Sequence, residues 1–190
     1  MRNPLLVGPR VYLRAMEPGD GDAMAEADAM ESDTFMYRGR RPSSPLESEE
    51  WIKKAYRERP PKEVPLAVCL RADERLIGVV GVDDLDWTNR TGETFSFLAV
   101  EHRGRGLGTE AKHLLLRYAF DRLGLHVLQS MVDAPNTRSA AALVKQGYRR
   151  AGIQRWADVK DRRYVDMLRF DLTREDWLAA HQRWQPASGS

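Results

Sequence analysis

The sequence has few of the residues that form disulfides or bind metals. Cysteine occurs once in 190 residues, as Cys69 within an apolar stretch, which excludes an intramolecular disulfide and gives no indication of an oxidising compartment. Histidine occurs four times, and these residues are too widely spaced for a zinc or iron site. We therefore expect Cys69 to be a buried thiol without a chemical role, and we expect no metal ion.

The sequence also lacks an excess of charge of either sign and a long apolar run. It holds 30 basic and 28 acidic residues, a formal net charge of +2, whereas a dedicated nucleic-acid binder concentrates positive charge. No apolar run reaches membrane length, and residues 1–11 are interrupted by Pro4 and Pro9 and lack the apolar core of a signal peptide. We expect a soluble, cytoplasmic protein that binds neither nucleic acid nor membranes.

The length of the chain suits one compact domain. We find no internal repeat, and we expect a single domain over 1–185 with a disordered tail at 186–190. Strands are expected at 11–14, 66–70, 76–85, 93–100 and 127–132, with a closing hairpin at 151–170. Helices are expected at 21–29, 46–59, 107–123, 136–146 and 174–184, and a loop at 37–45.

This order predicts an α/β fold of the α+β kind, with a central, mixed and mostly antiparallel sheet flanked by helices. The helix at 107–123 is the clearest, because its apolar residues recur at helical spacing. Its wheel places Lys112 and His113 away from the apolar face.

A glycine-rich, basic turn joins the strand at 93–100 to this helix. Its sequence is Arg103-Gly104-Arg105-Gly106-Leu107-Gly108. The first amides of a helix have no intrahelical acceptor and attract anions, and glycines let the backbone approach a phosphate closely. The turn is therefore a candidate phosphate site, although an ordinary surface turn can have the same composition.

Two familiar nucleotide sites fit the turn poorly. A dinucleotide-binding Rossmann turn requires a third glycine where Thr109 stands, and a meander of strands precedes the turn. A P-loop requires a lysine followed by serine or threonine, and none closes this glycine run. Both nucleotide-binding interpretations are thus disfavoured.

The turn resembles the signature of the GCN5-related N-acetyltransferase (GNAT) family, in which Arg or Gln is followed after two residues by Gly, one residue, and Gly or Ala. Arg103, Gly106 and Gly108 match it. The run 102–111 looks like the branch that includes ribosomal-protein N-terminal acetylases and relatives acting on small amines. A second family element is matched by Asn136, Ser139, Gly147 and Tyr148, and the branch's C-terminal segment by 175–177, so the similarity covers 11–177.

The resemblance implies an enzyme that transfers an acetyl group from acetyl-CoA to a primary amine, either a small molecule or a peptide N-terminus. It also implies that the strand before the turn separates from its neighbour, so that backbone near Leu98 and Val100 binds the pantetheine arm, while the turn binds the pyrophosphate. For Asn136 the alternative is a helix cap, compatible with cofactor contact, and for Ser139 a plain surface hydroxyl. The implied cofactor-binding residues are Leu98, Val100, Arg103, Gly104, Arg105, Gly106, Gly108, Thr109, Asn136 and Ser139.

Transfer in this family proceeds by direct attack of a neutral amine, so Cys69 is not needed as a nucleophile. Glu93 falls where many relatives carry the base that takes the proton, and its alternative is a solvated strand-edge glutamate. Leu143 stands where relatives often place a tyrosine acid, which leaves the Ser139 hydroxyl or water to protonate the thiolate. We expect Tyr148 to be a core residue.

The acceptor is not identified by the sequence. Asp83, Asp84 and Asp86 could attract a cationic amine, but a solvated loop is the favoured interpretation. Trp87, Trp156 and the loop at 38–41 could also shape an acceptor pocket. A non-catalytic acyl-CoA-binding domain is the rival function, and either a monomer or a homodimer is compatible with the family.

Overall fold

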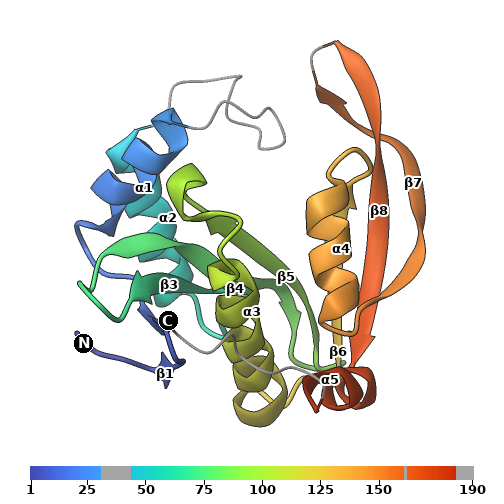
Figure 1. Ribbon diagram of the computed structural model, residues 1–190, viewed down its shortest axis with the longest axis horizontal. Coiled ribbons are helices and arrows are strands. Elements are labelled where there is room, and N and C mark those ends of the chain that lie inside the picture. Colours follow the sequence, from blue (N-terminus) through green and yellow to red (C-terminus); the bar gives the residue numbers. More distant parts are fainter. Residues whose placement is uncertain (31–43, 161, 183–190) are drawn as a thin grey trace.

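The computed structural model describes residues 1–30, 44–160 and 162–182 and shows one sheet of eight strands in the order β1-β2-β3-β4-β5-β6-β8-β7 (Figure 1). Neighbouring strands are antiparallel except β5 and β6, which are parallel. The predicted fold class is thereby confirmed. The strands are β1 Leu6–Val7, β2 Val11–Ala15, β3 Val64–Leu70, β4 Leu76–Asp86, β5 Thr91–Leu98, β6 Val127–Asp133, β7 Arg149–Lys160 and β8 Arg163–Thr173.

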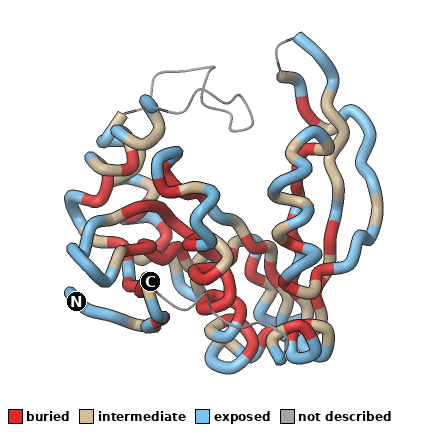
Figure 2. The backbone as a smooth tube through the Cα atoms, viewed as in Figure 1, coloured by how far each residue is buried: buried red, intermediate tan, exposed pale blue. Residues whose placement is uncertain are grey.

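Two hydrophobic clusters form on the two sides of β2–β4, because successive residues of a strand face opposite sides. One cluster holds Tyr12, Ala67 and Val79 and packs against α1 and α2, and the other holds Leu13 and Leu66 and packs against α3. Buried residues are concentrated in the sheet and α3, whereas much of β7 is exposed (Figure 2). The helices are α1 Asp20–Ala29, α2 Pro45–Arg57, α3 Leu107–Arg117, α4 Thr137–Lys145 and α5 Arg174–His181.

The helix expected at 107–123 is α3 followed by a π-helical turn, Tyr118–Arg122. Lys112 and His113, which the wheel places away from the apolar face, are nevertheless both buried. The His113 ring lies 5.9 Å from that of His181 on α5, and Lys112 lines a cavity described below. α3 is therefore covered on more of its circumference than a helix that merely lies on a sheet.

β5 and β6 separate after three paired residues, the last pair being Glu93 with Gln129. Beyond this pair, side chains replace the backbone ladder: the hydroxyl of Ser130 donates to the carbonyl of Thr94 (3.1 Å) and that of Thr94 to the carbonyl of Gln129 (3.2 Å). Inserted hydroxyls hold the strands apart, and the chains then diverge toward α3 on one side and α4 on the other (Figure 1). The separation implied by the family resemblance is thus present.

One expected strand ends earlier than the sequence predicts, and two expected irregular segments fall largely outside the described residues. The strand expected at 93–100 ends at Leu98, and Val100–His102 forms a 3-10 turn instead. Most of the loop at 37–45, including 38–41, and the tail at 186–190 lie outside the described residues.

Candidate active site

The glycine turn presents free amides at the start of α3. Gly104 and Gly106 have φ of 75° and 77°, which side chains other than glycine adopt at a cost. The amide of Glu110 makes the first helical bond, to the carbonyl of Gly106 (3.1 Å). The amides of Leu107, Gly108 and Thr109 precede this bond, so they point out of the helix end together with its positive dipole.

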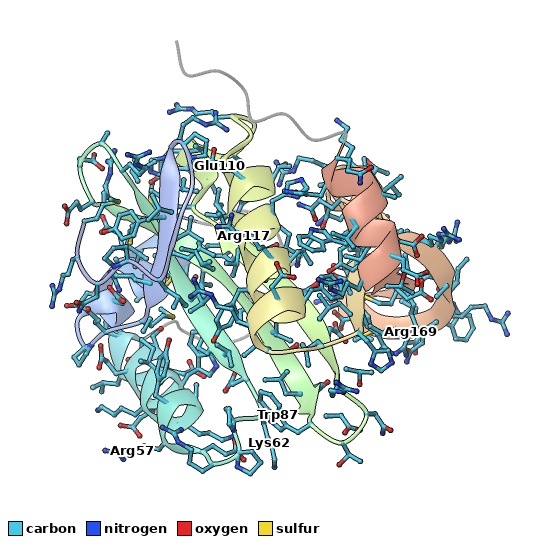
Figure 3. The ribbon with its side chains drawn as sticks, turned by 90° about the horizontal axis from the view of Figure 1, so that it is seen from below. Arg57, Lys62, Trp87, Glu110, Arg117 and Arg169 are labelled. Carbon is cyan, nitrogen blue, oxygen red and sulfur yellow. The ribbon has the colours of Figure 1, made fainter. Side chains whose placement is uncertain are left out.

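A buried glutamate fixes this turn. The side chain of Glu110 is only 1% exposed and accepts hydrogen bonds from the amides of Arg10 (2.7 Å) and Val11 (3.1 Å) and from Arg10 Nε (2.9 Å). Arg10 also donates from Nη1 to the carbonyl of Arg105 (2.8 Å). Glu110 lies where α3 meets the β1–β2 turn (Figure 3), so these bonds fix the backbone of the glycine turn at the start of α3.

A cavity of about 550 Å³ opens between this turn, β5, α3 and α4, a size suited to a small-molecule site. Eight of the residues predicted to bind cofactor line it, while Val100 and Arg105 do not. The sequence did not single out Lys112, Arg138 or Gln146, which line it as well. The eight are Leu98, Arg103, Gly104, Gly106, Gly108, Thr109, Asn136 and Ser139.

The free edge of β5 faces this cavity. Because the amide of Ala99 donates to Ile77 of β4 (2.9 Å), the amide and carbonyl of Leu98 point to the other side, into the gap where pairing with β6 has ended. Arg103 Nε donates to the Leu98 carbonyl (2.8 Å), and the Val100 carbonyl accepts from the amide of Arg103 (3.1 Å). The amide of Leu98 is thus the group that the gap exposes.

On α4, both interpretations of Asn136 hold together. Its Oδ1 accepts from the amide of Ser139 (3.1 Å), which makes Asn136 the N-cap of the helix, and both residues line the cavity. Leu143 is buried and lines the cavity too, so no phenol is present at that position. Tyr148 is a buried core residue as expected, and its hydroxyl lies 2.6 Å from that of Thr94.

Two carboxylates meet where β5 and β6 separate. Glu93 is the last residue of β5 paired with β6, and it lies opposite Asp83 in the register of β4 and β5. Burial, followed by the charge of Asp84, raises the pKa of Glu93. Burial, followed by the charge of Glu93, raises the pKa of Asp83 to about 6.

The solvated-loop interpretation of the three aspartates is therefore wrong for Asp83, which is half-buried within β4. Asp83 is the last residue of β4 in regular register with β5 before a bulge, in which the register shifts between Asp83 and Asp86 and Asp84 has φ of 46°. Asp84 is exposed, and Asp86 accepts from the amides of Thr88 and Asn89. Asp83 is thus the aspartate that pairs with Glu93 in the register, and the charge of Asp84 also acts on Glu93.

The two tryptophans considered for an acceptor pocket do not line the cavity. Trp87 donates from Nε1 to the carbonyl of Pro61 (2.7 Å) and lies beside Lys62 (Figure 3). Trp156 stacks on Tyr164 of the β7–β8 hairpin, with ring centroids 5.1 Å apart.

Within the described residues, no cluster of three or more histidine, cysteine, aspartate or glutamate side chains could hold a metal ion. No helix in this part of the chain is both long and apolar enough to span a membrane.

Comparison with known proteins supports the assignment suggested by the turn. Residues 10–149 match the family described as "Acetyltransferase (GNAT) domain". The "Putative ribosomal N-acetyltransferase YdaF" of Bacillus subtilis (strain 168) is 25% identical over 174 residues, which cover 90% of this chain and 95% of that protein. Spermidine N(1)-acetyltransferase of Escherichia coli (strain K12) is 25% identical over 113 residues, covering 60% and 61% of the two chains.

Solved structures share the fold. The spermidine N-acetyltransferase of Vibrio cholerae, crystallised with CoA and spermine, superposes with a TM-score of 0.79 at 24% identity, covering 90% of this chain and 99% of that one. Because the family match spans well over half of the chain, the chain belongs to the GNAT family and is an acetyl-CoA-dependent N-acetyltransferase.

Proposed function

We propose that this enzyme acetylates the primary amine of a small polycationic acceptor of the polyamine class, by direct attack on the acetyl-CoA thioester. The observation that carries the proposal is the carboxylate pair of Glu93 and Asp83 at the point where β5 and β6 separate. Neither residue lines the cavity, but both charges act on Lys112, which does. A base and an anionic acceptor site are thereby brought to one place.

In this proposal acetyl-CoA binds along the wall of the cavity, from the glycine turn to β5. The pyrophosphate binds the amides of Leu107, Gly108 and Thr109, and the pantetheine arm pairs with the exposed amide of Leu98 in place of a β6 strand. Asn136 and Ser139 contact the cofactor from α4. This route brings the thioester toward Glu93 and needs no covalent enzyme intermediate.

The charge around Glu93 favours a cationic acceptor. After burial, the charge of Asp84 raises the pKa of Glu93, and the charges of Glu93, Asp84 and Glu63 raise the pKa of the neighbouring Asp83. Arg169 on β8 and Lys112 on α3 are the cations that offset the charge of Glu93. An acceptor with a second ammonium group relieves the remaining repulsion, as spermidine would, which is the substrate that the names of two similar proteins give.

Glu93 then acts as the base. The pKa of Glu93 is raised, so its carboxylate binds a proton more strongly than an ordinary glutamate does. It is therefore the better base for the proton that the attacking nitrogen loses. Asp83 shares this titration and holds the acceptor.

The test is a panel of acceptors assayed by the release of free CoA thiol: spermidine, spermine, an aminoglycoside, free amino acids and peptides with free N-termini. We expect turnover with the polyamines to exceed turnover with the monocationic peptides at equal concentration, with a difference that shrinks at high salt. Preference for a peptide would contradict the acceptor class. Binding of acetyl-CoA without turnover on any amine would contradict the catalytic proposal.

A further inference from the structure

Lys112 is a buried lysine whose ammonium group is close to two carboxylates without bonding to them. It is 4% exposed on α3, and its Nζ forms no hydrogen bond or ion pair with any residue that the structure describes. A buried ammonium without partners is costly. Since Lys112 lines the cofactor cavity, its natural partner is a group of the bound substrates.

The position of Lys112 along α3 places it beyond the pyrophosphate site. It follows Thr109 by three residues and Gly108 by four, so it shares their helix face one turn deeper. One turn is about 5.4 Å along the axis. The charges of Asp83 and Glu93 both act on Lys112, and Lys112 lines the same cavity as the glycine turn. It is therefore near both sites, on the side of the cavity proposed for the pantetheine arm.

The reaction needs a proton donor at this place. The leaving thiolate of CoA must be protonated, but Leu143 offers no donor, and the Tyr148 hydroxyl is buried against Thr94. The Ser139 hydroxyl lies on α4, and a serine hydroxyl is a weak acid compared with an ammonium group. A donor reaching the cavity from α3 would replace the missing phenol.

We propose that the Lys112 ammonium is the general acid that protonates the departing CoA thiolate. This inference rests on the proposed transfer to an amine. The neutral amine attacks the thioester carbon, forming the C–N bond, and its nitrogen passes one proton to Glu93. The C–S bond then breaks with its electron pair on sulfur, which takes a proton from Lys112, and Glu93 returns its proton to Lys112. Amine and thioester thus give amide and thiol, with both side chains restored.

The electrostatic setting suits such a donor. Burial lowers the pKa of Lys112 to about 7, while Asp83 and Glu93 oppose the shift. An acid whose pKa lies near working pH is protonated enough to act and acidic enough to donate. The charged or titratable groups that line the cavity beside Lys112 are His102 and Arg103 near the turn, and Arg138 and Lys145 on α4. The charges of Asp83 on β4 and Glu93 on β5 act on Lys112 as well.

The test is single-turnover acetylation at saturating acetyl-CoA and acceptor, followed over pH. Wild-type transfer is measured first, because its absence would overturn the proposed function itself. If Lys112 is the acid, the wild-type rate should fall at high pH, where the ammonium group loses its proton. Lys112→Met should lower the rate about 100- to 10,000-fold and abolish this fall at high pH. Acetyl-CoA should still raise the melting temperature of the variant. Lys53→Met, a change of an exposed α2 lysine paired with Glu50, is the matched control.

Lys112→Arg separates proton donation from charge alone, since arginine keeps the cation but does not release a proton in this range. We expect it to lose activity as Lys112→Met does. A wild-type rate in either variant would overturn the proposal, as would a lower rate with the basic limb retained, which indicates a positioning role. A gain of an acetyl group on Lys112 during turnover, seen by peptide mass spectrometry, would show a nucleophile instead of an acid.

Discussion

Replacing Lys112 by Met should stabilise the fold, and the gain should fall as the pH rises. The pKa of Lys112 drops from 10.5 to about 7 in the folded protein, so the folded state disfavours the charged form. The unfolded chain therefore binds more protons between these values, and the stability of the wild type rises with pH through this window. The penalty is complete below pH 7 and disappears above about pH 10.5.

The magnitude follows from the size of the shift. At about 1.4 kcal/mol for each pH unit, a drop of about 3.5 units corresponds to roughly 5 kcal/mol at pH 6 and about 2 kcal/mol at pH 9. The pKa of about 7 already includes the attraction of Asp83 and Glu93. These figures are upper bounds, because the surroundings of a buried charge relax.

The assay is urea unfolding of wild type and Lys112→Met at pH 6 and pH 9, with the slope of the transition compared to confirm two-state behaviour. Lys53→Met should differ from wild type by about 0.5 kcal/mol or less at both pH values, because Lys53 is exposed. A Lys112→Met protein that is less stable than wild type at pH 6, or that has the same advantage at both pH values, would refute the reasoning.

Three further changes test other parts of the structure. Tyr148→Phe removes only the contact with the Thr94 hydroxyl, so it should cost about 1 kcal/mol in unfolding free energy and leave turnover within about threefold. A hundredfold loss of turnover would indicate that the Tyr148 hydroxyl, and not Lys112, is the acid. Glu110→Gln should destabilise the protein by about 3 kcal/mol, because the ion pair between Arg10 and the buried Glu110 is broken. It should also weaken acetyl-CoA binding in a calorimetric titration, and an unchanged affinity would show that this ion pair does not shape the turn for the cofactor. Gly106→Ala should cost about 1–2 kcal/mol at its positive φ, whereas Gly108→Ala should be tolerated, since its new Cβ would lie 3.7 Å from Leu98; equal melting temperatures would contradict the difference.

Local patterns predicted the parts of the site that one segment encodes. The turn at 103–108 and the Asn136 cap depend on residues close together in sequence, so their geometry follows from glycine conformation and helix-end chemistry. Other features depend on tertiary contacts. Glu110 finds its partner Arg10 one hundred residues away, and Asp83 lies opposite Glu93 only because β4 and β5 pair in this register.

Lys112 is the clearest example of a site residue that the sequence pattern could not predict. A helical wheel assigns lysine to solvent, because an isolated ammonium prefers water. Here the separation of β5 from β6 opens a cavity beside α3, and the lysine faces that cavity. The spacing of apolar residues in the sequence does not reveal such a cavity. The position of Lys112 in it follows only from the tertiary arrangement of β5, β6, α3 and α4.

In the proposed reaction, Glu93 takes the proton of the attacking amine where β5 and β6 separate. The most direct measurement is the single-turnover rate of acetyl transfer over pH for wild type, Glu93→Gln and the exposed control Glu175→Gln. A base with a raised pKa works only when deprotonated, so activity should rise with pH through the titration of the Glu93–Asp83 pair. We predict that Glu93→Gln lowers the rate about 100- to 10,000-fold and alters this acidic limb, with acetyl-CoA affinity retained and Glu175→Gln unchanged. A Glu93→Gln enzyme with the wild-type rate and the wild-type acidic limb would contradict the claim.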